Sequence, residues 1–324
     1  MSTKTAIPTH PRIAMIGAGV LGTVYGAKLA KAGHAVTVVE RAPARAESIR
    51  SNGLTIEKLD GTGRETFPVT VIDKLDSGAD FDLAIVIARK THLPGILEML
   101  APTAIPSVLF MMSNADGPAE ILAALGDRAV LGFPGAGGRV VDGVVQYSIP
   151  PAAMQSTMLG EIDGVVSDRI TSLKTLITSG GFNVAIAKNM DAWLKSHEAF
   201  VASTGNATYI AGTGAAIVKD RALLTLNIRA IREIYNAMDV AELKVEPAWF
   251  RLWQRLPLPV IRATYGGFVG SKAWDDLGTD QLHSMRDEVE AITDELLAFA
   301  RENGTPTPAL TELADRRRAL TPAG

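Results

Sequence analysis

The sequence contains no cysteine, which excludes a disulfide framework, a thiolate nucleophile and any metal site built on cysteine. Neither sign of charge dominates, because 32 Lys and Arg residues face 35 Asp and Glu residues and leave a net charge of −3. The basic surface typical of nucleic-acid-binding proteins is therefore missing. No apolar run approaches the roughly 20 residues of a membrane span, and the first residues lack the apolar core of a signal peptide. We expect a cytoplasmic protein that binds neither nucleic acid nor a membrane.

The chain does have the length and apolar content of a folded protein with two domains. It has 324 residues, of which 47% are hydrophobic. Domains average roughly 150 residues. Near Ala187 the sequence changes from alternating strand and helix patterns to mainly helical patterns. We therefore expect one domain at residues 1–187 and a second at residues 188–324.

Residues 1–187 alternate short apolar runs with helical patterns. Unbroken apolar runs are typical of parallel strands that are buried on both faces. The expected strands are residues 12–16, 35–39, 81–88, 107–111, 129–133 and 139–149. The expected helices are residues 20–31, a helix that starts near Pro43, and residues 93–99 and 118–125. Strands that alternate with helices at this rhythm predict an α/β domain with a mainly parallel sheet.

Residues 188–324 have a different, helical pattern. The expected helices are residues 190–209, 221–242, 247–255 and 281–303. In the last helix, apolar residues recur at three- and four-residue steps and form one apolar stripe. We expect residues 316–324 to be a solvated tail despite their three arginines. The pattern predicts an all-helical second domain.

A glycine-rich motif connects the first expected strand to the first expected helix. The candidate cofactor-binding residues in it are Gly17, Gly19, Val20, Leu21 and Gly22. In this GxGxxG pattern the first glycine allows a tight turn, the second lets the backbone approach a pyrophosphate, and the third lets helix and strand pack closely. The helix N-terminus favours the phosphate charge. This context predicts a Rossmann-type dinucleotide-binding domain, and the alternative is a glycine-rich turn without a ligand.

The choice of cofactor depends on the residues after the second expected strand. Glu40 could bond the ribose hydroxyls of NAD and would repel the 2′-phosphate of NADP. Arg41, with Arg45 close behind, could pair with that phosphate by charge-assisted bonds. A solvent-facing Arg41 is a third alternative. The residues alone leave NAD and NADP open.

Several segments along the chain, from the glycine-rich motif to the end of the last expected helix, can be compared together with known families. They are residues 16–22, 41, 85–90, 112–117, 132–147, 192–195, 286–288 and 303–304. In these segments the sequence resembles the ketopantoate reductase (2-dehydropantoate 2-reductase) family. The resemblance implies an NADPH-binding Rossmann domain, a helical domain and catalysis in the cleft between them. It also implies hydride transfer from NADPH to the ketone of a 2-oxo acid, which yields pantoate in pantothenate biosynthesis on the route to coenzyme A.

The resemblance also implies roles for particular residues. Lys195 matches the catalytic lysine, and Glu288 matches the carboxylate that holds the substrate's hydroxyl group. Lys90 and Asn114 match groups at the nicotinamide end of the cofactor site, and Asn114 would also help to position the substrate. Arg41 matches the ligand of the 2′-phosphate, which favours NADPH over the NAD that Glu40 suggests.

Four positions depart from the family's pattern, and the first is Ala115, where the family has a glycine after the asparagine. The family's helix usually has asparagines one and two turns after the catalytic lysine, where this chain has Ala199 and Ser203. Ser203 remains a candidate substrate-binding residue. The family's substrate-binding serine before the last helix aligns with Asp276. Fewer amide donors leave less discrimination for ketopantoate, so reduction of some 2-oxo acid is better supported than formation of pantoate.

The residue types fit the chemistry of ketone reduction. The ammonium of Lys195 could stabilise the charge that develops on the carbonyl oxygen and could deliver a proton. The alternative is an ordinary solvent-facing lysine. Glu288 borders the apolar stripe of its helix, where a carboxylate needs a partner such as a substrate hydroxyl or Lys195. The alternative for Glu288 is a surface ion pair.

We expect the remaining polar and aromatic residues of interest to have structural roles. His197 and Glu198 are adjacent, with no matching ligand at a four-residue step, so we predict no metal site and a core histidine beside Trp193. The aromatic cluster of Trp249, Phe250 and Trp253 is interpreted as core or as a subunit contact, which leaves a homodimer open.

Two further functions stay open at this point. The first is a related dehydrogenase that acts on another hydroxy acid or forms an opine-type secondary amine; Glu40 and the missing amides motivate it. The second is a non-catalytic NADP-binding sensor, in which Lys195 and Glu288 have no reason to cluster.

Overall fold

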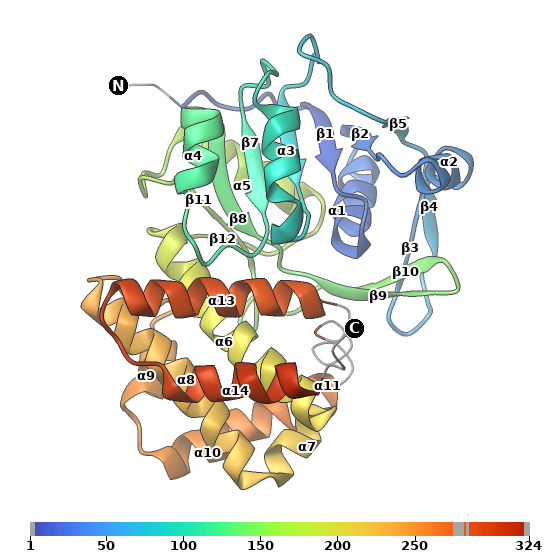
Figure 1. Cartoon of the computed structure of the whole chain (residues 1–324). Helices are drawn as coiled ribbons and strands as arrows, with labels where there is room; N and C mark the ends of the chain where they lie inside the picture. The colour runs from blue at the N-terminus through green and yellow to red at the C-terminus, as the bar shows by residue number, and fades with distance from the viewer. Residues whose placement is uncertain (1–3, 275–281, 283–284, 321–324) are drawn as a thin grey trace. The chain divides into compact units, whose positions relative to one another are not determined.

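The computed structural model describes residues 4–274, 282 and 285–320, and its contacts divide the chain into two compact units (Figure 1). The first, called the Rossmann unit, comprises Met1–Met112 and Pro118–Met190. The second, called the helical unit, comprises Ser113–Gly117 and Asp191–Gly324. The short segment Ser113–Gly117 therefore belongs with the helices, although it lies within the first half of the sequence. Asp276 and the start of the helix expected at residues 281–303 lie outside the described residues.

An eight-stranded sheet forms the centre of the Rossmann unit, with strand order β12-β11-β8-β7-β6-β1-β2-β5. The strands are β1 Arg12–Ile16, β2 Ala35–Val39, β5 Thr70–Ile72, β6 Leu83–Val86, β7 Val108–Met111, β8 Ala129–Phe133, β11 Thr157–Gly160 and β12 Val184–Ile186. Every neighbouring pair is parallel except β8 and β11. Every residue of β6 and β7 is buried. This confirms the mainly parallel sheet that the unbroken apolar runs predict.

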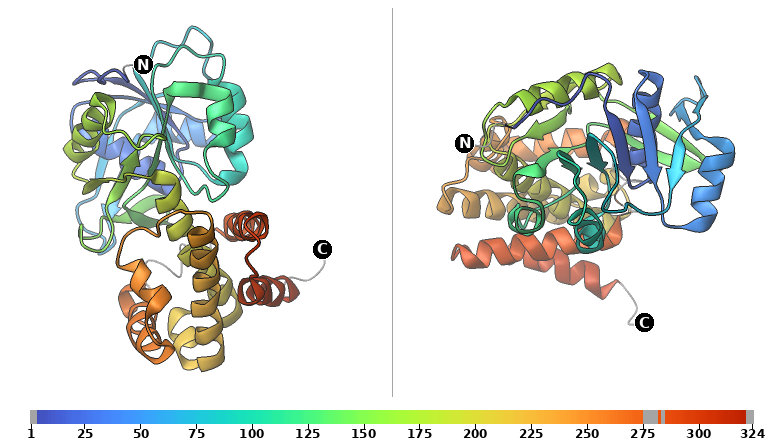
Figure 2. Two further views of the ribbon diagram at one scale, coloured as in Figure 1. Left: turned by 90° about the vertical axis from the view of Figure 1, so that its left-hand side faces the viewer. Right: turned by 90° about the horizontal axis from the view of Figure 1, so that it is seen from above.

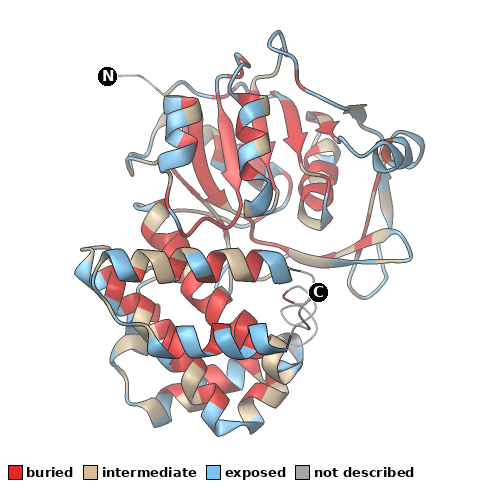
Figure 3. Ribbon diagram, viewed as in Figure 1, coloured by how far each residue is buried: buried red, intermediate tan, exposed pale blue. Residues whose placement is uncertain are grey.

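Helices cover both faces of this sheet (Figures 1 and 2). On one face, α1 (Val20–Lys31) contacts α5 (Asp168–Ser179); on the other, α3 (Leu93–Leu100) contacts α4 (Ala119–Leu125). The helix α2 (Pro43–Asn52) contacts the edge strand β5 and begins at Pro43, as expected from the fixed φ of proline. The core strands are buried throughout, whereas the helices are buried mainly on one side (Figure 3).

A second, four-stranded sheet has the order β4-β3-β10-β9. Its strands are β3 Leu54–Lys58, β4 Glu65–Phe67, β9 Gly137–Val141 and β10 Val144–Ser148. The single strand expected at residues 139–149 is therefore wrong, because β9 and β10 form an antiparallel hairpin. Asp142 and Gly143 form its turn with φ of 49° and 80°, and an Asp-Gly pair between β-forming runs is a strong signal for such a turn.

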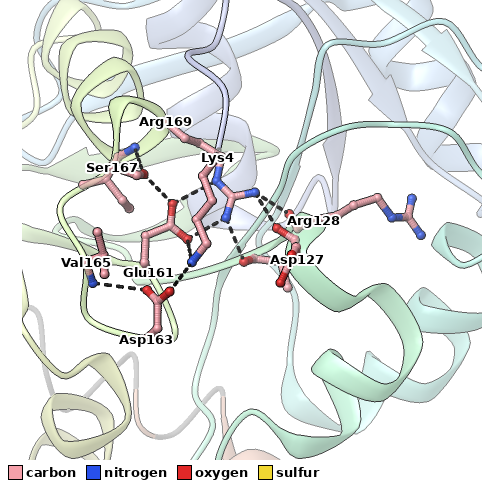
Figure 4. Close-up of polar contacts among 10 residues, drawn as sticks. Lys4, Asp127, Arg128, Glu161, Asp163, Val165, Ser167 and Arg169 are labelled. Atoms are coloured by element: carbon pink, nitrogen blue, oxygen red, sulfur yellow. Dashed lines mark hydrogen bonds and ion pairs between the residues drawn. The ribbon is translucent and has the colours of Figure 1, made fainter. Parts of the chain in front are cut away.

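A buried ionic network lies beside the large sheet (Figure 4). Arg169 of α5 donates to the carboxylate of Glu161 from Nε at 3.0 Å and from a terminal nitrogen at 2.5 Å. Ser167 and Lys4 also donate to this carboxylate, at 2.6 and 3.0 Å. Arg169 bonds the carbonyl oxygen of Asp127 at 2.8 Å as well. Both charged groups therefore have several partners, as stable buried charges require.

The described part of the helical unit is built from helices. They are α6 Met190–Ala211, α7 Gly214–Lys219, α8 Arg221–Val240, α9 Phe250–Arg255, α10 Leu258–Val269, α11 Lys272–Trp274, α13 Arg286–Glu302 and α14 Pro308–Ala319. Helix α8 contacts α7, α9, α10, α13 and α14, so it lies at the centre of this core. The all-helical second domain is confirmed, although α7, α10, α11 and α14 were not expected. No described helix is long and apolar enough to cross a membrane.

The end of the chain differs from expectation. Residues 316–319 belong to α14, and Arg317 is only 1% exposed, so the solvated tail is wrong for the described part. Arg317 donates to the Glu290 carboxylate at 3.1 Å. Consecutive arginines on a helix point in different directions, so one of the three faces the core while its neighbours stay exposed.

Candidate functional site

The glycine-rich loop has the geometry that a dinucleotide-binding turn needs. Gly17 adopts a positive φ of 95°, and a Cβ there would collide with the backbone of Ile87. A Cβ at Gly22 would collide with the carbonyl oxygen of Gly17, so this glycine allows α1 to begin directly against the loop. Both positions therefore require glycine for close approach of the backbone.

The N-terminus of α1 is open on the side of Gly19. A Cβ at Gly19 would have no neighbour within 4 Å, and no side chain caps the helix there. Val20 and Leu21 are partly buried and pack on the core, which fixes the first turn. The first N–H groups of α1 and their dipole can thus approach an anion. The open space at Gly19 is compatible with the pyrophosphate of a dinucleotide.

Three charged residues follow β2 near this loop. The Glu40 carboxylate accepts from the backbone N–H of Ala42 at 2.9 Å and lies 3.6 Å from Nε of Arg45. Arg45 also donates to the carbonyl oxygen of Ala18 within the glycine-rich loop. Arg41 is exposed, and its guanidinium extends towards Gly95 at the start of α3. Glu40 is therefore held by local partners, whereas the Arg41 guanidinium is accessible.

Lys90 is also in the Rossmann unit. It starts a short 3₁₀ segment, Lys90–His92, between β6 and α3, and it is partly buried. This position is at the carboxyl end of β6, which neighbours β1, and ligands of open α/β sheets bind outside the carboxyl ends of the strands.

Lys195 lies in the helical unit, on α6. It is 4% exposed, so the solvent-facing alternative is wrong. Its Nζ bonds Oδ1 of Asp191 one turn earlier, at 2.5 Å, and lies 5.2 Å from the centre of the Phe299 ring. A Cβ atom built on Gly117 would lie 3.5 Å from Nζ of Lys195, so Gly117 is close to this ammonium. A buried ammonium therefore faces the segment Ser113–Gly117.

That segment carries Asn114 and is held by α13. Asn114 is 1% exposed, and its amide donates to the carbonyl oxygen of Gly117 at 2.9 Å. The backbone N–H groups of Ala115 and Asp116 donate to Oε2 of Glu295 at 2.9 and 3.1 Å. Glu295 thus fixes the turn that brings Asn114 and Gly117 next to Lys195.

Two further carboxyl groups are buried in the same unit. Glu288 on α13 is 4% exposed, so the surface ion pair is wrong. Glu198 on α6 is fully buried, one turn after Lys195. Burial, followed by the charge of Glu288, raises the pKa of Glu198 well above its usual value. The charge of Glu295 raises this pKa further, while the Ser113 hydroxyl opposes the shift.

The two positions where the family's amides are missing are also buried. Ala199 and Ser203 are both 0% exposed, and Ser203 lies two turns after Lys195. The Ser203 hydroxyl has no hydrogen-bond partner among the described residues. His197 is partly buried and stacks on Trp193, with ring centres 5.0 Å apart, which confirms the placement beside that ring.

The structure therefore places Asn114, Lys195 and Glu288 in the helical unit, with Ser203 further along α6. The glycine-rich loop, Arg41 and Lys90 lie in the Rossmann unit. The sequence analysis missed the polar residues Asp191, Glu198 and Glu295. Asp191 and Glu198 stand four residues before and three after Lys195, a spacing that puts all three on one helix face. Among the described residues, no group of three or more His, Asp or Glu side chains could hold a metal ion.

The fold and the glycine-rich loop define a protein with a Rossmann-type dinucleotide-binding domain and a helical second domain. Residues 13–149 match the family model described as Ketopantoate reductase PanE/ApbA. A 2-dehydropantoate 2-reductase of Halobacterium salinarum is 26% identical over 178 residues, which cover 54% of this chain and 57% of that relative. The match thus spans little more than half of the relative's length. The resemblance to the ketopantoate reductase family is confirmed.

Solved structures share the fold over almost the whole chain. The 2-dehydropantoate 2-reductase of Geobacter metallireducens has a TM-score of 0.75 at 18% identity, covering 96% of this chain and 100% of that one. The probable 2-dehydropantoate 2-reductase of Bacillus subtilis has a TM-score of 0.71 at 20% identity, covering 95% and 99%. A ternary structure of D-mandelate dehydrogenase with NADH and anilino(oxo)acetate has a TM-score of 0.72 at 15% identity, covering 95% and 97%. At such identities the likeness shows the fold alone.

Proposed function

We propose that the protein is an NADPH-dependent reductase of a 2-oxo acid. The observation that carries this proposal is the buried ammonium of Lys195, paired with Asp191 and facing the turn that bears Asn114. A buried charge of this kind is costly unless it has a task or complete pairing. The glycine-rich loop and the names of the related reductases support the same activity.

The reaction adds one hydride to the carbonyl carbon and one proton to the carbonyl oxygen. The nicotinamide cofactor, when bound, supplies the hydride. Lys195 stabilises the negative charge that develops on the oxygen, and it then delivers the proton from Nζ. Asp191 holds the ammonium in place; its side chain is 25% exposed against 5% for Lys195, so it offers a route for reprotonation from solvent. Asn114 positions the substrate from the neighbouring turn.

We assign the cofactor preference to NADPH. Glu40, which would repel a 2′-phosphate, is held by Arg45 and the N–H of Ala42. Arg41 is exposed and offers a guanidinium for charge-assisted bonds to that phosphate. Glu40 keeps NADH as an alternative, and D-mandelate dehydrogenase, which shares the fold, was solved with NADH.

As the particular substrate we propose ketopantoate, which would be reduced to pantoate for pantothenate biosynthesis. The named relatives support this choice. The absorbance of reduced nicotinamide should fall when the protein is mixed with NADPH and ketopantoate. A panel of other 2-oxo acids, each with NADPH and NADH, measures the preference. Protein that binds NADPH but oxidises it with no 2-oxo acid would contradict the proposal.

A second candidate is a dehydrogenase for another 2-hydroxy acid. Ala199 and the unpartnered Ser203 hydroxyl favour it, because they change the groups available to a substrate. Preference for NADH together with rejection of ketopantoate would support this candidate. The non-catalytic sensor is disfavoured, because Lys195 and Glu288 are both buried within the same unit.

A further inference from the structure

Glu198 has the most unusual environment of any acidic side chain described in the helical unit. It is 0% exposed, and neither of its carboxyl oxygens has a hydrogen-bond partner of normal geometry among the described residues. The Ser113 hydroxyl is near enough to lower the pKa of Glu198, but its geometry is not that of a normal hydrogen bond. A buried polar group without a partner destabilises the fold, so its presence calls for an explanation outside the fold.

The position of Glu198 indicates what that explanation is. Glu198 follows Lys195 by three residues on α6, so both side chains lie on one helix face. It also faces Ser113, which begins the turn that bears Asn114, and it interacts with Glu288 of α13. An unpartnered carboxyl group thus stands among the residues to which the proposed function assigns substrate binding.

The surrounding charges determine the protonation state of Glu198. Asp191 and Lys195 on α6 neutralise each other, while Glu288 and Glu295 on α13 both oppose a negative charge on Glu198. Burial acts in the same direction. Burial and the two carboxylates therefore favour the protonated form of Glu198, and a neutral carboxylic acid can donate one hydrogen bond and accept others.

We propose that Glu198 is a substrate-binding residue, whose carboxylic acid acts together with the Glu288 carboxylate to hold a hydroxyl group remote from the reacting carbonyl. A hydroxyl group both donates and accepts. It can donate to the carboxylate of Glu288, which only accepts, and accept the proton that Glu198 offers. This proposal rests on the proposed function, since it concerns the substrate of the same site, and it adds a residue that the sequence analysis left aside.

Two variants separate binding from folding. Glu198→Leu removes the hydrogen bonds, and Glu198→Gln keeps a neutral group that donates and accepts. Because the leucine also removes an unpaired buried carboxyl group, we expect its midpoint of thermal unfolding to rise by about 2–4 °C. A residue that serves only the fold would show the opposite. If leucine does not fit the site, Glu198→Met supplies the same comparison.

The decisive substrates are ketopantoate and its analogue that lacks the hydroxyl group. In Glu198→Leu we expect the KM for ketopantoate to rise about tenfold, with little change for the analogue. The KM of Glu198→Gln for ketopantoate should be closer to the wild-type value than the KM of Glu198→Leu is. Equal effects on both substrates, or no effect on either, would overturn the proposal, as would preference for a 2-oxo acid that carries an ammonium in place of the hydroxyl.

A binding measurement keeps this test independent of turnover. Calorimetric titration with pantoate should show weaker binding to Glu198→Leu than to the wild type, and the analogue without the hydroxyl group should bind both equally. If the wild type turns over no 2-oxo acid, the proposed function fails. If it turns over ketopantoate while the titrations of the two proteins coincide, only the role of Glu198 fails.

Discussion

The two units treat buried carboxyl groups in opposite ways. In the Rossmann unit the Glu161 carboxylate accepts bonds from Arg169, Ser167 and Lys4, so its charge is fully compensated. In the helical unit Glu198 is equally buried, yet neither of its oxygens has a partner of normal geometry among the described residues. A buried carboxylate is tolerated where it is paired and hydrogen-bonded, whereas a buried carboxyl group without partners leaves its hydrogen-bonding capacity unused by the fold. The contrast separates a structural network from a candidate binding site.

The largest effect is expected from breaking the structural network. Arg169→Met leaves the Glu161 carboxylate buried without its main partner, which should lower the free energy of unfolding by about 3–5 kcal/mol. Urea denaturation measures this loss, and Arg50→Met on the exposed side of α2 is the matched control. Turnover per folded molecule should stay normal. Stability equal to that of the control would show that Arg169 contributes little.

The next largest effect is expected in the helical unit, on the rate. Lys195→Ala removes the proposed proton donor and should lower kcat by roughly two orders of magnitude or more. Binding of NADPH, followed by its fluorescence, should change little because the candidate cofactor-binding loop lies in the other unit. Lys188→Ala, an exposed lysine close in sequence, is the control. Near-normal turnover by Lys195→Ala would contradict a catalytic role for Lys195.

The pH dependence of stability should have opposite signs in the two units. Burial alone would raise the pKa of Glu161, but the bonds from Arg169, Ser167 and Lys4 outweigh it and lower this pKa. Its stabilisation is therefore complete above the unfolded pKa of about 4.3 and disappears as pH falls through the folded value. The stability lost in Glu161→Gln should shrink in acid.

Glu198 should behave in the reverse manner, because burial and the charge of Glu288 raise its pKa in the folded protein. Above about pH 4.3 the unfolded chain loses this proton and the folded chain keeps it, so the wild type becomes less stable as pH rises. Glu198→Gln should thus gain stability relative to the wild type between acid and neutral pH. Denaturation series at several pH values measure the unfolding free energy of both variants relative to the wild type. If this difference changed with pH in the same direction for Glu161→Gln and Glu198→Gln, the two buried carboxyl groups would not differ as we expect.

The smallest effect concerns the cofactor. Arg41→Ala should weaken the binding of NADPH about tenfold and leave the binding of NADH nearly unchanged, since only NADPH has a 2′-phosphate. Direct titration with each nucleotide measures this ratio, and Arg50→Ala serves as the control. Equal weakening of both nucleotides would assign Arg41 to the adenine or to the fold instead.

Much of the fold could be predicted from local patterns. Strands such as β6, β7 and β8 are unbroken apolar runs, and the loop at Gly17 depends on glycine at close contacts, so both are visible in the sequence. The hairpin of β9 and β10 was merged into one strand, because its Asp142-Gly143 turn interrupts a single run of β-forming residues. Helix α10 was missed, since Gly266 and Gly267 weaken its helical signal.

The candidate site could be predicted only in part. Lys195, Glu288 and Asn114 followed from the resemblance, which carries residues position by position. The burial of Glu198 and the bonds of Glu295 depend on which faces of α6 and α13 meet the segment Ser113–Gly117. Those contacts join residues as much as 180 positions apart, and helical periodicity holds no information about them.

The most direct test of the central claim follows the hydride itself. NADPH that carries deuterium at the reactive carbon of its nicotinamide can be incubated with the protein and ketopantoate, and the product can be examined by mass spectrometry and NMR. The expected product is a hydroxy acid with deuterium on the carbon that carried the keto oxygen. Unlabelled hydroxy acid, or intact ketopantoate beside nucleotide-bound protein, would contradict this claim.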